Sequence, residues 1–298
     1  MARSKRAQRI AGNAVLAALR GYFWVGERVA PGLASRLALD LWLRVPPPPP
    51  ASRRDRGLPP GVGIETTVRG QRLVARAWGS GPSVLLVHGW AGWWQQLSVY
   101  VEPLVAAGFR VVAWDAPGHG ESPPGRFGNG RAGIPDFVDG IDAVAAALGA
   151  GPIAGIVAHS GGAMAGAMAL MDGLDADCAV FIAPAVDTAD MIDYAGRRLG
   201  FGPRTGAALV RRAREAYGVH LARDFNVPAA VPRAGGGLPP ALIVHDEADT
   251  DAPHHGADRL AAVWPQATLV TTTGLGHHKV LWSRETVARV VSFLSGSS

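Results

Sequence analysis

The sequence has only one cysteine among its 298 residues. A single thiol cannot form a disulfide within the chain, so the fold depends on its apolar core and its hydrogen bonds. Cys178 opens the apolar run 178–182, which is typical of a buried strand, and there it would be a small core residue in a reducing compartment. We therefore expect a cytoplasmic protein.

Long apolar runs are also absent. No uninterrupted stretch approaches the roughly eighteen residues that cross a bilayer as a helix. The chain starts with basic residues, as a signal peptide does, but Arg20 and Glu27 interrupt the segment that follows and no clear cleavage site comes after it. The sequence therefore predicts neither a membrane-spanning helix nor a cleaved leader.

Acidic residues are fewer than basic ones, and the formal net charge is +5. Most of the excess lies in the arginines before Gly57 and in residues 196–223. This distribution argues against a nucleic-acid groove that runs along the whole molecule, and we expect no nucleic-acid partner. We also expect no cofactor and no metal site.

The order of the expected elements predicts an α/β fold. Strands that alternate with helices form a mostly parallel sheet with helices on both faces and a functional site at the carboxyl ends of the strands. We expect strands at residues 63–68, 72–78, 83–87, 108–114, 153–158, 178–182, 241–244 and 268–271, and helices at 97–107, 136–148, 163–170 and 285–294.

Two regions depart from this alternation. Residues 1–50 suggest two helices and then an extended proline run, so we divide the chain into an N-terminal helical extension with a linker (1–50) and a main domain (51–298). Residues 185–239 contain only short helical stretches. An insertion at this point is where a small helical cap over the active site would lie, and a surface insertion without a function is the alternative.

A short apolar strand runs into Ala158-His159-Ser160-Gly161-Gly162, and good helix formers follow. A strand that becomes a helix within about two residues forces the apex residue into a strained backbone conformation. Small residues two positions to either side of the apex let the strand and the helix approach each other. Ala158 and Gly162 are those residues, so Ser160 is the apex and its hydroxyl is exposed.

This segment resembles the nucleophile elbow of the α/β-hydrolases, G-x-S-x-G, with Ala158 in place of the first glycine. A serine nucleophile needs a base that takes its proton and an acid that orients the base. His277 matches the family's catalytic histidine, because it follows Gly276 in a loop between the last strand and the last helix. The adjacent His278 is the alternative.

The resemblance also implies the acid. In this family the acid comes three residues after a turn residue that follows a strand, which makes Asp246 the turn residue and Asp249 the acid. The chain order of serine, aspartate and histidine is that of the α/β-hydrolases. The competing carboxylates in this segment are Asp246, Glu247 and Asp251.

The tetrahedral intermediate of acyl transfer needs two hydrogen-bond donors. The backbone N–H of Gly161 is one, because it opens a helix whose dipole favours negative charge. His88-Gly89-Trp90 resembles the family's oxyanion-hole motif, which implies the backbone N–H of Trp90 as the other. Trp93 and Trp94 suggest an apolar acyl or aromatic pocket, and simple packing of these two rings is the alternative.

Together these features indicate a serine hydrolase that cleaves a small carboxylic ester through an acyl-enzyme on Ser160. Thioester, lactone and carbon–carbon bond hydrolysis use the same triad and stay open, as does perhydrolysis. A non-catalytic binding protein that has kept the fold is the alternative of another class. Such a protein would have lost a triad member, and this sequence retains all three.

The N-terminal helices have broad apolar surfaces. In the first helix the polar residues Arg6, Arg9, Asn13, Arg20 and Glu27 share one side, and most of the remaining perimeter is apolar. So much apolar surface must be covered. We expect it to dock on the main domain or on a second subunit of a homo-oligomer, and peripheral contact with a membrane is the alternative.

Overall fold

The computed structural model describes residues 2–54, 56–149, 151–219, 221–234 and 237–296. The chain divides into two compact units, each made of two segments. The sheet unit contains Arg44–Asp187 and Val227–Ser298, and the helical unit contains Met1–Leu43 and Thr188–Asn226. The site that the sequence indicates lies wholly in the sheet unit.

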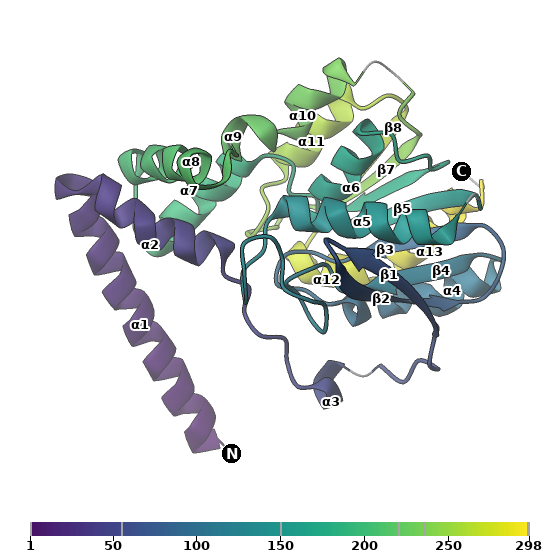
Figure 1. Ribbon diagram of the computed structural model, residues 1–298, viewed down its shortest axis with the longest axis horizontal. Coiled ribbons are helices and arrows are strands. Elements are labelled where there is room, and N and C mark those ends of the chain that lie inside the picture. The colour runs from purple at the N-terminus through teal and green to yellow at the C-terminus, as the bar shows by residue number, and fades with distance from the viewer. Residues whose placement is uncertain (1, 55, 150, 220, 235–236, 297–298) are drawn as a thin grey trace. The chain divides into compact units, whose positions relative to one another are not determined.

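The sheet unit contains an eight-stranded sheet with the order β1-β2-β4-β3-β5-β6-β7-β8 (Figure 1). Strand β2 runs antiparallel to β1 and β4, and the other neighbouring pairs are parallel. The prediction of a mostly parallel α/β sheet is therefore confirmed. The strands are β1 (Val62–Val68), β2 (Gln71–Trp78), β3 (Ser83–Val87), β4 (Arg110–Trp114), β5 (Ile153–His159), β6 (Ala179–Ile182), β7 (Ala241–Asp246) and β8 (Ala267–Thr272).

Helices pack on both faces of this sheet, which is why the central strands are continuously apolar rather than alternating. Val84 and Leu86 of β3 point to one face, where they join a core that includes residues of η1, α4, α12 and α13. Helix α5 packs against α6 and β1, and α6 also packs against β3, β5 and β6. The bounds are α3 (Ala51–Arg54), η1 (Trp94–Tyr100), α4 (Val101–Ala106), α5 (Ile134–Leu148), α6 (Gly161–Met171), α10 (Val227–Ala230), η2 (Val231–Arg233), α11 (His255–Val263), α12 (Gly276–Trp282) and α13 (Arg284–Leu294).

The helical unit joins the N-terminal helices to helices of the insertion between β6 and β7. Its elements are α1 (Ala2–Val29), α2 (Pro31–Leu43), α7 (Thr188–Leu199), α8 (Pro203–Tyr217) and α9 (Leu221–Asp224). Phe23 of α1 is fully buried, and its ring centroid lies 5.3 Å from that of Phe201. The extension and the insertion, which the sequence suggested as separate additions, thus share one small core.

A glutamate fastens the two segments of the helical unit. The Glu27 carboxylate accepts hydrogen bonds from the backbone N–H groups of Gly202 (3.1 Å), Arg204 (2.9 Å) and Thr205 (2.9 Å) at the start of α8. These N–H groups have no partner within their own helix, and the helix dipole favours a negative charge beside them. Glu27 therefore caps a helix that lies far away in the sequence.

The polar side predicted for α1 is described only in part. Asn13 and Arg20 are exposed, and Glu27 is partly buried by its contact with α8. The side chains of Arg6 and Arg9 lie outside the described residues. Among the helices that the structure describes, none is both long and apolar enough to cross a membrane.

Candidate active site

Ser160 lies at a sharp turn between β5 and α6, with φ 54° and ψ −121°. This backbone conformation is unfavourable for a residue with a side chain and persists only where its surroundings hold it. The Ser160 N–H donates to Ile182 O (3.0 Å), and Ser160 O accepts from Ala163 N (3.0 Å) and Ala185 N (3.2 Å). The neighbouring strand and the first turn of α6 thus fix the apex.

Two glycines let the loop after β3 approach this turn. A Cβ on Gly162 would lie 2.3 Å from the His88 carbonyl oxygen, and a Cβ on Gly89 would lie 2.9 Å from the Ser160 Cβ. Both distances are too short for real contacts, so neither position accepts a larger residue without a shift of the backbone. At the departure from G-x-S-x-G, the Ala158 methyl is fully buried in β5 and faces Gly166 of α6.

The structure brings Ser160, His277 and Asp249 together. The Ser160 Oγ lies 3.0 Å from His277 Nε2, and His277 Nδ1 lies 2.7 Å from Asp249 Oδ2. This geometry assigns the proton of the neutral ring to Nδ1, where it is donated to the carboxylate. The lone pair on Nε2 is then directed at the serine hydroxyl, as a general base requires.

The Asp249 carboxylate is held by four contacts. Its Oδ1 accepts from the backbone N–H groups of Asp251 (2.8 Å) and Ala252 (2.9 Å), and its Oδ2 contacts His277 and His245 Nε2 (3.1 Å). Burial raises the pKa of Asp249, but the hydrogen bonds from His245 and His277 outweigh it, and the pKa lies well below its usual range. The group is therefore a fixed anion beside His277.

Asp246 has a different task, although it lies only three residues earlier. Its Oδ1 accepts from Ala248 N (3.0 Å), and its Oδ2 accepts from Thr272 Oγ1 (2.8 Å) and Leu275 N (2.9 Å). These contacts join the turn after β7 to the residues that precede α12. His277 lies in the first turn of α12, not in a loop as the sequence predicted, because the helix already begins at Gly276. Of the other two competing carboxylates, the exposed Glu247 accepts from Thr273 Oγ1, and Asp251 contacts Asp249 through its backbone.

Two further histidines lie beside His277. His159 is buried beneath the turn, with its Nε2 3.1 Å from the His277 carbonyl oxygen. Burial, and next the neighbouring His277, lowers the pKa of His159 to about 3, so its ring is neutral at physiological pH. The exposed His278 stacks against the ring of Trp282, at 6.4 Å between centroids.

Nitrogen atoms of His159, His277 and His278 lie within 4.8 Å of one another, so among the described residues this group could hold a metal ion. Neutral imidazoles are the form that binds transition metals. Both ring nitrogens of His277 already face Ser160 and Asp249. An ion bound there would displace one of these partners, and it would therefore block general-base chemistry rather than support it.

The loop after β3 brings the second candidate oxyanion donor to the elbow. The backbone N of Trp90 lies 3.7 Å from the ideal Cβ position of Gly161, so the backbones of the two residues are adjacent. The buried His88 braces this loop, because its Nε2 accepts from Ala116 N (2.9 Å) and its Nδ1 then donates to Gly89 O (2.8 Å). The backbone N of Trp90 thus lies near Gly161, the residue that follows Ser160, and the pair stays our candidate for the oxyanion hole.

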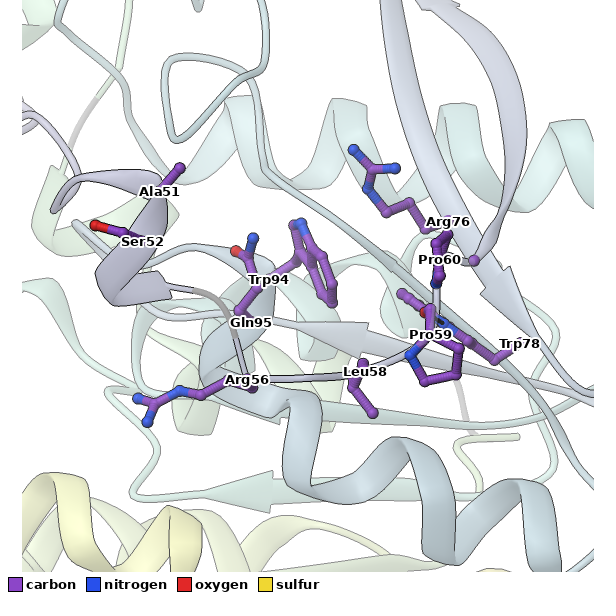
Figure 2. Close-up of a pocket in the computed structure, with 11 residues that line it drawn as sticks. Ala51, Ser52, Arg56, Leu58, Pro59, Pro60, Arg76, Trp78, Trp94 and Gln95 are labelled. Atoms are coloured by element: carbon purple, nitrogen blue, oxygen red, sulfur yellow. Dashed lines mark hydrogen bonds between the residues drawn. The ribbon is translucent and has the colours of Figure 1, made fainter.

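The two candidate pocket tryptophans are only partly buried. The ring of Trp94 packs 5.2 Å from that of Trp78, and the Arg76 guanidinium lies 5.9 Å from the Trp94 ring. Trp94, Trp78 and Arg76 line a surface pocket of about 390 Å³ together with Arg56 (Figure 2). The lining of this pocket includes neither Trp93 nor a triad residue. No described contact brings Trp94 to Ser160, and the indole Nε1 of Trp93 is buried.

The sequence did not predict one residue of the site, His245. His245, at the end of β7, is fully buried, and its Nε2 faces both Asp249 Oδ2 and Ala252 O at 3.1 Å. A nitrogen that faces two acceptors carries the proton, so His245 donates to Asp249 Oδ2, the same oxygen that His277 Nδ1 contacts. The only signal in the sequence was the four-residue spacing between His245 and Asp249, which has no meaning without the turn.

The comparisons with known proteins agree with this architecture. Residues 82–216 match the family described as alpha/beta hydrolase fold, and residues 221–297 match the family described as TAP-like protein. A 65-residue stretch is 38% identical to a non-heme chloroperoxidase of Kitasatospora aureofaciens. That match spans 20% of this chain and only 22% of the length of the chloroperoxidase.

Solved structures show the same fold at low sequence identity. An esterase of Pyrococcus furiosus has a TM-score of 0.62 at 19% identity, and the match covers 85% of this chain and 98% of that chain. A monoacylglycerol lipase of Paleococcus ferrophilus has a TM-score of 0.58 at 22% identity (76% and 99%), and a meta-cleavage product hydrolase of Pseudomonas fluorescens has 0.60 at 17% (80% and 99%). The matches support a hydrolase, and the chain has the α/β-hydrolase fold.

Proposed function

We propose that this protein is a serine hydrolase that cleaves carboxylic esters through an acyl-enzyme on Ser160. The observation that carries the proposal is the continuous hydrogen-bond chain from Ser160 Oγ through His277 to Asp249, with distances of 3.0 and 2.7 Å. A serine hydroxyl is a weak nucleophile until a positioned base takes its proton. The positions of His277 and Asp249 relative to Ser160 support the roles of base and orienting carboxylate for them.

In the first half-reaction, Ser160 Oγ attacks the acyl carbonyl carbon while His277 Nε2 takes the hydroxyl proton. The carbonyl oxygen becomes an anion, which the N–H groups of Trp90 and Gly161 stabilise. The imidazolium of His277 is stabilised by Asp249. When the tetrahedral intermediate collapses, the bond to the alcohol breaks and His277 returns the proton to the leaving oxygen.

In the second half-reaction, water replaces the alcohol. His277 Nε2 takes a proton from the water as its oxygen attacks the acyl carbon, and the same two N–H groups receive the second oxyanion. Collapse then breaks the bond to Ser160 Oγ, and His277 returns the proton to the serine. The products are one carboxylic acid and one alcohol, and the enzyme returns to its starting state.

The insertion helices are our candidate for the substrate-selecting element, because of their place in the chain between β6 and β7. Substitutions within residues 185–239 should change the relative kcat/KM among esters of different chain length while the reactivity of Ser160 towards a fluorophosphonate stays the same. An equal loss of activity on every ester would instead indicate a structural element. Thioesters and lactones belong in the same panel, because they need the same triad.

The test of the proposal is a kinetic comparison of the full-length protein with Ser160→Ala on p-nitrophenyl esters of graded chain length. We expect hydrolysis by the wild type and none above background by the variant. His278→Ala is the matched control, because this exposed histidine contacts neither Ser160 nor Asp249 in the structure and its loss should leave most activity. Equal hydrolysis by wild type and Ser160→Ala would contradict the proposal.

A further inference from the structure

Helix α1 has a second apolar face that its own unit does not cover. One face, which includes Phe23 and Gly26, is buried in the helical unit. Another face carries five exposed residues, which we call the α1 stripe. They recur at intervals of three and four along the helix: Val15, Ala18, Tyr22, Val25 and Val29.

The exposure of the α1 stripe is large. Val15 is 60% exposed, Val25 50% and Val29 75%, and these are among the most exposed large apolar side chains of the described residues. From Val15 to Val29 the stripe extends about 21 Å along the helix axis. Single exposed apolar residues need no explanation, but a continuous row of them indicates an interaction surface.

The charges of α1 show which kind of surface fits. The sequence of α1 contains six basic residues and a single acidic one. That acid is Glu27, whose carboxylate already caps α8 within the helical unit. The basic residues are Arg3, Lys5, Arg6, Arg9, Arg20 and Arg28.

A second copy of the chain would fit this face poorly. In a two-helix coiled coil, residues that flank the apolar row form ion pairs between the helices. The residues beside the α1 stripe are Ala14, Gly21 and Arg28 on one side and Leu19 and Gly26 on the other, and none is acidic. Two copies would thus bring together positive charges without compensation, whereas a negatively charged surface would attract them.

One aromatic residue of the α1 stripe also suits a lipid surface. Tyr22 lies in the stripe and is 46% exposed. Tyrosine favours the boundary between water and lipid, because one end of it is apolar and the other is polar. Arg28 flanks the stripe, and an arginine there can reach lipid phosphates while its own stem stays on the apolar side.

We propose that α1 binds along the surface of an anionic lipid bilayer, with the α1 stripe inserted among the lipid chains and the basic residues of the helix at the headgroups. A helix with an apolar face and a basic polar face lies in the plane of the interface and is held by both terms. The helix docks on the helical unit through one face and on lipid through the other. The inference does not depend on the chemistry of Ser160.

The first experiment is co-sedimentation of the full-length protein with vesicles of phosphatidylglycerol and phosphatidylcholine, and with vesicles of phosphatidylcholine alone. We expect binding to the anionic vesicles that weakens as salt screens the charges, and little binding to the neutral ones. Absence of binding to anionic vesicles, or equal binding to both kinds, would overturn the proposal.

Variants test the stripe itself. Replacement of Val15, Val25 and Val29 together by serine should weaken binding to anionic vesicles at least about tenfold. The three apolar side chains that would be buried in the lipid are then lost. All three residues are exposed, so circular dichroism and the Tm should stay as in the wild type. Unchanged binding would overturn the proposal.

A matched pair separates the face of the helix from its charge. Ala17→Asp and Ala18→Asp add the same charge at adjacent exposed positions of α1, but only Ala18 lies in the α1 stripe. Ala18→Asp should weaken binding at least about tenfold more than Ala17→Asp, because its carboxylate would have to enter the lipid. Equal effects, or a wild-type dimer in light scattering that the triple serine variant converts to monomer, would contradict the lipid proposal.

Discussion

The site at Ser160 and the helix α1 are held in place in different ways. Around Ser160 most of the contacts involve the backbone. Strand β6 and the turn hydrogen-bond each other, two glycines admit the loop after β3, and Asp246 accepts from the backbone of Leu275 just before α12, which carries His277. Helix α1 is held by Phe23 and Glu27 on one side and has an exposed apolar row on another. The contacts of the Ser160 region lie within the sheet unit, whereas α1 has an apolar surface that its own unit leaves exposed.

This difference explains what substitutions should do in each region. A residue whose neighbours lie within one closed network cannot change without disturbing chemistry or the fold. A residue on an exposed helix face can change while the protein stays folded, because its contact is made only with a partner. The following changes sharpen or break that comparison, from the largest expected effect to the smallest.

Loss of the nucleophile or the base should abolish turnover. Ser160→Ala and His277→Ala should each lower kcat by about 10⁴–10⁶-fold, and the double variant should be scarcely worse, because the two residues act as one unit. Steady-state kinetics with a p-nitrophenyl ester measures this, and the Tm shows that each variant is folded. An additive loss in the double variant would mean that the two residues act separately.

The two aspartates after β7 should respond differently. Asp249→Asn should lower kcat by about 10³–10⁴-fold at nearly unchanged stability, because the amide no longer favours the correct tautomer of His277. Asp246→Asn should instead lower stability, since the hydrogen bonds that it accepts from Thr272 and Leu275 weaken. Kinetics and chemical unfolding of the two variants distinguish these roles. If Asp246→Asn were the more damaging to kcat at unchanged stability, Asp246 would be the acid.

An added methyl group should have different effects on stability at the two adjacent glycines of the elbow, Gly161 and Gly162. Gly162→Ala should destabilise the protein by about 1–3 kcal/mol, because the new Cβ would lie 2.3 Å from the His88 carbonyl oxygen. Gly161→Ala is the matched control for stability, since its Cβ would have no neighbour closer than 3.7 Å. Chemical unfolding measures both, and equal stabilities would show that the loop after β3 does not approach the elbow as described.

Buried neutral histidines should make the protein sensitive to acid. Burial is the main cause that lowers the pKa of both His119 and His159 to about 3, whereas an unfolded histidine titrates near about 6.5. Between these values the unfolded chain binds more protons, so stability falls as the pH is lowered, by up to about 1.4 kcal/mol per pH unit for each histidine. Unfolding free energies measured from pH 7 to pH 4 should show this slope, and His159→Gln should reduce it. A flat profile would contradict the neutral state.

The smallest effect is expected at the cap of α8. Glu27→Gln should destabilise the helical unit by about 1 kcal/mol, because a neutral amide interacts less well with the start of the helix. Proteolysis of the segment Thr188–Asn226 measures this loss. Glu215→Gln is the control, since it removes the same charge from an exposed position of α8. Equal cleavage of both variants would show that Glu27 does not fasten the unit.

The strands, the elbow and the order of the triad residues could be predicted because each depends on short stretches of sequence. The apolar run that becomes β5 and the small residues beside Ser160 impose their geometry locally. His245 and Glu27 could not be found in this way, because their partners are chosen by the folded chain. Glu27 meets α8 at a distance of 175 residues from Gly202, and no local pattern marks such a contact.

The measurement that tests the central claim most directly is the mapping of the covalent adduct that a fluorophosphonate forms with the intact protein. The account predicts one adduct per chain, on the peptide that contains Ser160, with labelling lost in Ser160→Ala and greatly slowed in His277→Ala. A wild-type protein that stays unlabelled, or one that carries the label on another residue, would contradict the claim that Ser160 is the activated nucleophile.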